Sequence, residues 1–153
     1  MAGLDLNEIT TRAITVLSGC AYGPAQLITT LLKPEQEDYA AVFAGDAAQQ
    51  AAASYASFWQ QPPTALAKAV NARVFVVVKL TQDIVTSEEF PGGYSKIAHL
   101  LLPDQAWCRF KFIGDGGESV MAYDGLVWRN GRFAWFPKPW RALPPPAQLP
   151  TDN

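Results

Sequence analysis

Four residues in the second half of the chain carry groups that could move protons: Tyr94, His99, Tyr123 and Asp124. His99 is the only histidine, so any base catalysis by an imidazole must use it. Asp124 falls inside an aromatic segment, where burial would raise its pKa toward the range useful for proton transfer. One hypothesis is therefore acid–base chemistry by Asp124 and His99, with Tyr94 or Tyr123 as the hydrogen-bond donor.

Each of these residues also has a structural interpretation, and we favour it. A lone histidine without a visible partner is more often structural than catalytic, and an aspartate next to Gly125 is typical of a β-bulge or a turn. The sequence has no GxSxG, HExxH or CxxC pattern. The "GDGGE" stretch at 114–118 lacks the lysine and following helix of a phosphate loop. We therefore expect no metal ion, no cofactor and no nucleotide site.

A second group of residues, aromatic rings and arginines on predicted strands, is typical of binding surfaces. Arg129 and Arg132 lie opposite each other beside a predicted turn, where like charges repel. An anionic partner or nearby carboxylates could stabilise them, but we favour two solvated side chains. The candidate binding residues are Trp107, Arg109, Trp128, Arg129, Arg132, Phe136 and Trp140.

The closing segment "FPKPWRAL", residues 136–143, allows two interpretations. Its prolines hold the chain extended, and it carries Lys138, Trp140 and Arg141. Tryptophan and arginine dominate many protein interfaces, so the segment could dock on another subunit. We slightly favour a strap that packs back over the core of the same domain.

The first half of the chain, residues 5–70, is predicted to be helical. Apolar residues recur at three- and four-residue steps over 6–17, behind Asp5 or Asn7 as a helix cap. Pro24 and Pro34 suit the first turns of two short helices. Asp46 can cap an alanine-rich helix, which Pro62 and Pro63 end.

The second half, residues 73–137, is predicted to form a sheet. The stretches 73–80 and 106–113 alternate with a period of two. A strand is also predicted over 94–102, with His99 on the same face as Ile97 and Leu101; the alternative is that the middle of this segment is helical. Asn130-Gly131 is a strong hairpin signal, and a two-residue turn pairs Arg129 with Arg132.

These elements predict an α+β domain, with N-terminal helices packed on one face of a curved antiparallel sheet of about four to six strands. Among 153 residues, 49% are hydrophobic and 17% are charged, which is enough to bury a core. We expect one domain over 1–143 and a proline-rich tail over 144–153. The element order resembles the nuclear-transport-factor-two-like and cystatin-like group, and "YDGLVWRNGRFAWFPKPWRAL" is similar to the last strand pair of small bacterial members. The resemblance implies a cone with a pocket, but the sequence shows no match to the Asp/His or Asp/Tyr pairs of the group's enzymes.

Composition narrows the function classes further. The net charge of −2 and the pI of about 5.3 argue against a general nucleic-acid binder. No apolar run is long enough for a membrane helix, and the N-terminus lacks the basic region of a secretory signal. Cys20 and Cys108 are far apart in sequence, which favours two buried thiols and a cytoplasmic setting.

We therefore expect a non-enzymatic domain that binds a protein or a small apolar ligand. A homodimer through one sheet face, which includes Phe136, is one form of this expectation. The alternative is a small cone-pocket enzyme of the isomerase or hydratase type, acting through Asp124 and His99.

Overall fold

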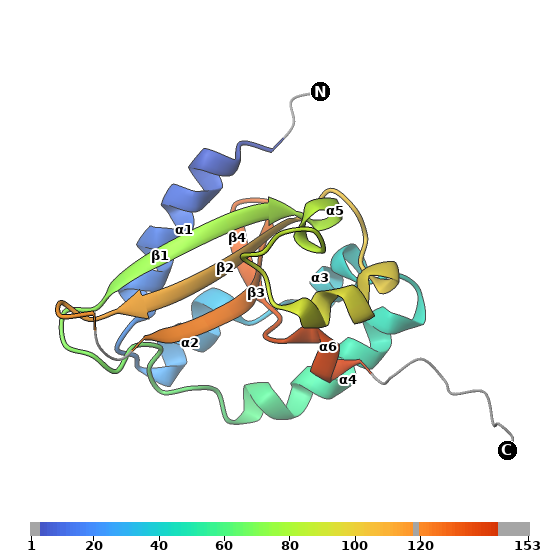
Figure 1. The fold of residues 1–153 in the computed structure, drawn as a ribbon. Helices are drawn as coiled ribbons and strands as arrows, with labels where there is room; N and C mark the ends of the chain where they lie inside the picture. The colour runs from blue at the N-terminus through green and yellow to red at the C-terminus, as the bar shows by residue number, and fades with distance from the viewer. Residues whose placement is uncertain (1–3, 118–119, 144–153) are drawn as a thin grey trace, which may run out of the picture.

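The computed structural model describes residues 4–117 and 120–143, so the predicted tail at 144–153 lies outside the described residues. It shows an α+β fold built on one curved, antiparallel, unclosed sheet (Figure 1). The four strands follow one another in space as they do in sequence: β1 (Arg73–Leu80), β2 (Ala106–Ile113), β3 (Met121–Arg129) and β4 (Arg132–Trp135). The predicted class is confirmed, with four strands.

Four helices precede the sheet, as predicted: α1 (Leu6–Cys20), α2 (Ala25–Leu32), α3 (Gln36–Val42) and α4 (Asp46–Gln60). The Asp5 carboxylate accepts hydrogen bonds from the backbone N–H groups of Asn7 and Glu8, both at 3.1 Å, and so caps α1. Pro24 stands directly before α2.

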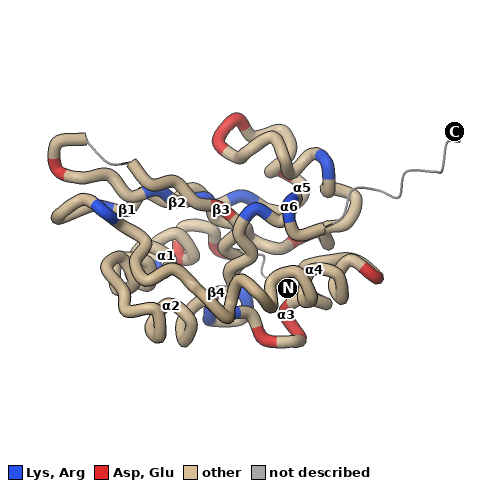
Figure 2. Tube along the Cα trace, turned by 90° about the horizontal axis from the view of Figure 1, so that it is seen from below, with Lys and Arg blue, Asp and Glu red and all other residues tan. Residues whose placement is uncertain are grey.

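The helix α1 covers one face of the sheet and leaves part of the other open. Val74, Val76 and Val78 of β1 pack against the core. Phe75, which points to the opposite face of the sheet, is 45% exposed. With the sheet seen from below, α1 and α2 lie on one side of it and α5 (Thr81–Ile84) lies on the other (Figure 2). The period-two pattern of β1 therefore separates a covered face from a partly open one.

Helix α4 packs against the end of β4. Tyr55 of α4 contacts Phe136, with ring centroids 6.0 Å apart, and Phe58 contacts Trp135 at 5.6 Å. Because consecutive residues of an extended chain point to opposite faces, one helix reaches both faces at this edge. The second face of the hairpin is thus covered by the same chain.

The hairpin itself forms as predicted. Asn130 and Gly131 have φ values of 51° and 99°, the positive range that a tight hairpin turn needs. Arg129 pairs with Arg132 and Leu126 pairs with Trp135.

The strand predicted over 94–102 is wrong, and the alternative of a helical middle is confirmed. This segment forms two short 3₁₀ helices, η1 (Gly92–Lys96) and η2 (Ala98–Leu100), and only Leu101 makes an isolated bridge, to Phe43. The buried residues Tyr94 and Ile97 are three apart, which suits the three-residue turn of a 3₁₀ helix. His99 consequently lies on the surface and not on a strand face.

Candidate functional site

Asp124 lies at a β-bulge in β3, the structural setting that its position beside Gly125 suggests. Cys108 pairs with Leu126 and Phe110 pairs with Tyr123, so two residues of β3 stand opposite Arg109 alone. Gly125 has a φ of 87°, and a Cβ atom there would lie 2.0 Å from the Phe136 carbonyl oxygen. The bulge therefore requires glycine, because the backbone after β4 passes directly over it.

The side chain of Asp124 is 4% exposed and ties three segments together. Its Oδ1 accepts a hydrogen bond from the Tyr94 hydroxyl at 2.8 Å and one from the Lys138 backbone N–H at 3.1 Å. Burial raises the pKa of Asp124, and these two hydrogen bonds oppose the rise. Burial and the neighbouring Asp124 also raise the pKa of Tyr94 well above its usual value. Asp124 thus joins β3 to η1 and to the segment after β4.

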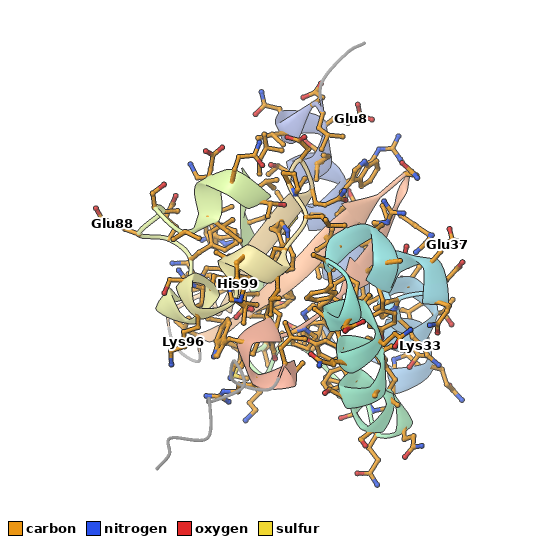
Figure 3. All side chains as sticks on the ribbon, turned by 90° about the vertical axis from the view of Figure 1, so that its right-hand side faces the viewer. Glu8, Lys33, Glu37, Glu88, Lys96 and His99 are labelled. Carbon is orange, nitrogen blue, oxygen red and sulfur yellow. The ribbon has the colours of Figure 1, made fainter. Side chains whose placement is uncertain are left out.

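The structure brings Tyr94 to Asp124 but does not bring the other predicted acid–base residues there. His99 is exposed on η2, on the side of the molecule that faces the viewer in Figure 3. The Tyr123 hydroxyl donates to the Leu66 carbonyl oxygen at 2.7 Å. Among the described residues, the hydrogen-bond partners of the Asp124 carboxylate are Tyr94 and Lys138, which departs from the hypothesis that pairs it with His99.

The two hairpin arginines bind a buried carboxylate, so the expectation of two solvated side chains is wrong. Asp38, at the start of α3, is fully buried. Arg132 donates two hydrogen bonds to its carboxylate, at 2.7 and 2.8 Å, and Arg129 donates one at 3.1 Å. Burial alone would raise the pKa of Asp38, but hydrogen bonds from Arg132, the Glu35 backbone and Arg129 outweigh it and lower that pKa.

Several predicted binding residues belong to the core and not to a surface. Trp107 is buried and donates its indole N–H to the Thr81 hydroxyl at 3.1 Å. Phe136 is also buried, so the predicted homodimer contact through this residue is wrong; its ring packs against α3 and α4. Trp140 lies over Gly93, and its ring centroid is 5.1 Å from that of Tyr94, so the closing segment is a strap over its own domain. The expectation that this segment is extended is wrong, because Pro139–Ala142 form the short helix α6, with a proline at its first position.

The two remaining predicted binding residues are partly exposed. Arg109 donates to the Glu89 carbonyl oxygen at 2.6 Å. The guanidinium of Arg12 lies 5.8 Å from the ring centroid of Trp128, within range of a cation–π interaction.

A cleft of about 400 Å³, which we call the aromatic cleft, lies where α4 meets β3, β4 and the strap. Rings from three elements line it, together with two cationic residues of the strap. The lining residues are Ser54, Tyr55, Phe58, Pro63, Tyr123, Trp135, Pro137, Lys138, Arg141 and Ala142. Sequence patterns could not reveal this cleft, because its walls come from segments up to 88 residues apart that only the fold assembles.

The two cations at the aromatic cleft form no ion pair within the described part of the chain. Lys138 and Arg141 are exposed, and neither forms one of the ion pairs seen there. A second cleft, of about 270 Å³, also has two arginines in its wall, Arg12 and Arg132. Those two pair with Glu8 and Asp38, respectively. Only the aromatic cleft of the two thus offers cations without a carboxylate partner.

The polar groups of the aromatic cleft suit binding better than proton transfer. Its lining, all of it described, contains no carboxylate, imidazole or thiol. The Tyr55 hydroxyl donates to the Pro137 carbonyl oxygen at 2.8 Å, and the Tyr123 hydroxyl donates to the Leu66 carbonyl oxygen. Burial raises the pKa of both phenols, so both stay neutral near pH 7.

Comparisons with known proteins give no relative: no family model, no curated protein and no solved structure matches this chain. Within the described residues, no three histidine, cysteine, aspartate or glutamate side chains gather as metal ligands would. None of the helices seen in residues 4–117 and 120–143 has the length and apolar character to cross a bilayer.

Proposed function

We propose that this protein is a binding domain for a small molecule that has a flat apolar body and one anionic group, held in the aromatic cleft. The single observation that carries this proposal is the combination of aromatic walls with the cations Lys138 and Arg141, which form no ion pair among the described residues. The volume of about 400 Å³ falls within the range of small-ligand sites. Rings supply apolar contact area, and the cations fix the orientation of an anion.

A binding role is supported over a catalytic one by what lies within reach of a bound molecule. Asp124, the residue with the pKa shift most useful for catalysis, is buried behind Lys138 and 4% exposed. The polar groups that do face the aromatic cleft are the Ser54 hydroxyl, two neutral phenols, an indole and the side chains of Lys138 and Arg141. These groups bind and orient a ligand without exchanging protons with it near pH 7.

The test compares two fluorescent dyes of similar shape, anilinonaphthalene sulfonate and its uncharged relative phenylnaphthylamine. In the double variant Lys138→Gln/Arg141→Gln, we expect the Kd of the sulfonate dye to rise roughly tenfold, about 0.7 kcal/mol for each exposed charge. The Kd of the uncharged dye should change by less than about twofold, since the rings are untouched. Lys96→Gln, which removes an exposed charge on η1, is the matched control.

Two outcomes would refute the proposal: equal weakening of both dyes in the double variant, or equal weakening of the sulfonate dye by Lys96→Gln. Near-ultraviolet circular dichroism of each variant checks that the fold is retained, because this dye also binds partly unfolded chains. Salt should weaken the sulfonate dye more than the uncharged one.

The same proposal includes a reducing compartment such as the cytoplasm. Cys20 and Cys108 are both buried and unpaired, which supports it. Burial raises the pKa of the Cys108 thiol to about 12, so this thiol stays protonated and unreactive near neutral pH.

A further inference from the structure

The two edges of the sheet are treated differently by the fold. Among the described residues, no strand pairs with the outer edge of β1 or of β4, but β4 is four residues long and α4 packs against its end, whereas β1 is eight residues long. β1 pairs with β2 over eight consecutive residues without a register shift, and it contains no proline. Proteins usually block such an edge with a proline, a bulge, a very short strand or charged side chains, because free N–H and C=O groups pair with another strand. Of these devices, β1 has only the charges of Arg73 and Lys79, which lie near its two ends.

Helix α1 places an apolar side chain beside the same open edge. Arg12 contacts Trp128 of the hairpin, and Ala13 faces the core with an exposed fraction of 0%. Successive helical residues are about 100° apart, so Ile14 lies on the flank of α1 opposite to Arg12. That flank is the one nearer β1, and Ile14 is 38% exposed there. Because α1 packs on β1, a second copy paired at the β1 edge would bring its own α1 against this flank and bury Ile14.

The uncovered face of β1 adds apolar area next to the edge. Phe75, 45% exposed, and Val77 line a shallow hollow with Arg109 and Lys111 of β2. We infer that two copies of this chain associate by antiparallel pairing of their β1 strands, which joins the two sheets into one. This surface lies on the opposite sheet edge from α4 and is separate from the aromatic cleft.

The charges on β1 select one register for this pairing. In an antiparallel pair around a two-fold axis perpendicular to the sheet, opposing residues share a face, so the axis passes through a residue and not between two. The longest pairing has this axis at one of the two central residues of β1, Val76 or Val77. An axis at Val76 would place Arg73 opposite Lys79 of the second copy, and it would do so twice. An axis at Val77 places Phe75 opposite that lysine, whose alkyl stem can pack on the ring. The strand is therefore self-complementary around Val77, and this favours a second copy over an unrelated protein.

The backbone geometry of β1 makes this register testable. Thr81 donates its N–H to the Gln105 carbonyl oxygen at 2.9 Å, just beyond the Leu80–Ala106 pair. By alternation, the N–H of Val77 also points toward β2, and the N–H of Val76 points outward. Val77 and its symmetry copy would then form a non-hydrogen-bonded pair, with Cα atoms about 4.5 Å apart. That separation permits a disulfide.

The first experiment is mild oxidation of the folded full-length variants Val77→Cys and Phe75→Cys, followed by non-reducing electrophoresis. We expect most of the Val77→Cys chain to become a covalent dimer. Phe75→Cys should stay mostly monomeric, although Phe75 is more exposed, because two copies of residue 75 lie about 13 Å apart in this register. Equal cross-linking of the two variants, or none in Val77→Cys, overturns the inferred register and pairing. The natural cysteines are buried and serve as the background in wild type.

The second experiment is the molar mass by light scattering of the wild-type chain and of Val76→Pro. We expect wild type to give twice the chain mass of 16.7 kDa. Proline at residue 76 removes an N–H that points outward, so β1–β2 pairing survives while edge pairing is lost. The variant should therefore be a folded monomer. A wild type that is monomeric at the concentration of the cross-linking experiment overturns the inference.

Discussion

At the scale of single residues, Asp38 joins the helical half of the chain to the hairpin. Its carboxylate is fully buried and accepts three hydrogen bonds from Arg129 and Arg132. The repulsion expected between these two arginines is thereby replaced by attraction to one shared anion. The arginine pair can be recognised in the sequence, but its partner cannot, since Asp38 is 91 residues away from Arg129.

Asp38→Asn should lower the free energy of unfolding at pH 7 by about 3 kcal/mol, because it leaves two arginines beside a neutral amide. The pKa of Asp38 is lowered in the folded state, so its contribution is present above the unfolded pKa and is lost as the pH falls through the folded one. Urea titrations of both proteins at pH 7 and at about pH 3 would show this as a difference that shrinks in acid. A difference independent of pH would mean that the charge is not what stabilises the pair.

Asp124 has the opposite sign of pH dependence. Burial raises its folded-state pKa, so its ionisation costs stability as the pH rises from the unfolded pKa through the folded one. As the pH falls, protonation of Asp38 therefore lowers the free energy of unfolding, whereas protonation of Asp124 raises it.

At the scale of elements, the strap formed by residues 136–143 depends on the packing of Trp140 on η1. A Cβ atom at Gly93 would lie 2.3 Å from the Trp140 indole, whereas one at Gly92 would meet nothing within 4 Å. The two adjacent glycines thus differ in what lies above them and not in their helical propensity.

Gly93→Ala should push Trp140 from its place and lower the thermal midpoint by several degrees, about 1–2 kcal/mol for a domain of this size. Gly92→Ala should change the free energy of unfolding by less than about 0.5 kcal/mol. Differential scanning calorimetry measures both, and the tryptophan fluorescence of Gly93→Ala should shift to the red. If both variants melt alike, the strap does not pack as described.

The strap also forms part of the aromatic cleft, through Pro137, Lys138, Arg141 and Ala142. Displacing Trp140 should therefore weaken dye binding in Gly93→Ala as well as lowering its stability, an effect that Gly92→Ala would not share.

At the scale of the whole molecule, buried side chains fill both sides of the sheet. Trp135 packs on one side with Phe58 and Phe110, and Phe136 packs on the other with Phe43 and Trp107. The last residues of the hairpin therefore anchor two layers at once.

Phe136→Ala should destabilise the protein by about 4 kcal/mol, the cost of emptying a fully buried aromatic site. Its molar mass in light scattering should stay that of wild type, since Phe136 lies in the core and β1 is on the opposite edge of the sheet. A loss of association in a folded Phe136→Ala variant would instead place an interface at this residue.

The local elements of this protein could be predicted from sequence wherever a short-range pattern decides the structure. The cap at Asp5, the alternation in 73–80 and the Asn130-Gly131 turn each depend on neighbours within a few residues, and each is present. The strand predicted around His99 failed because a period of two and a period of three overlap in a short apolar stretch. The resemblance to nuclear-transport-factor-two-like and cystatin-like proteins stays a prediction.

The candidate site could not be predicted in the same way. Each of its features joins segments far apart in the chain: Asp38 with two arginines, Asp124 with Tyr94, and α4 with the strap at the aromatic cleft. Burial, which sets the direction of both carboxylate pKa shifts, is likewise a property of the packed molecule. The sequence alone determined the fold class, the strand register of the hairpin and the residue types at hand. Only the tertiary structure decided which charges are neutralised and which face a ligand, because local backbone preferences act over a few residues whereas charge pairing and burial depend on the whole fold.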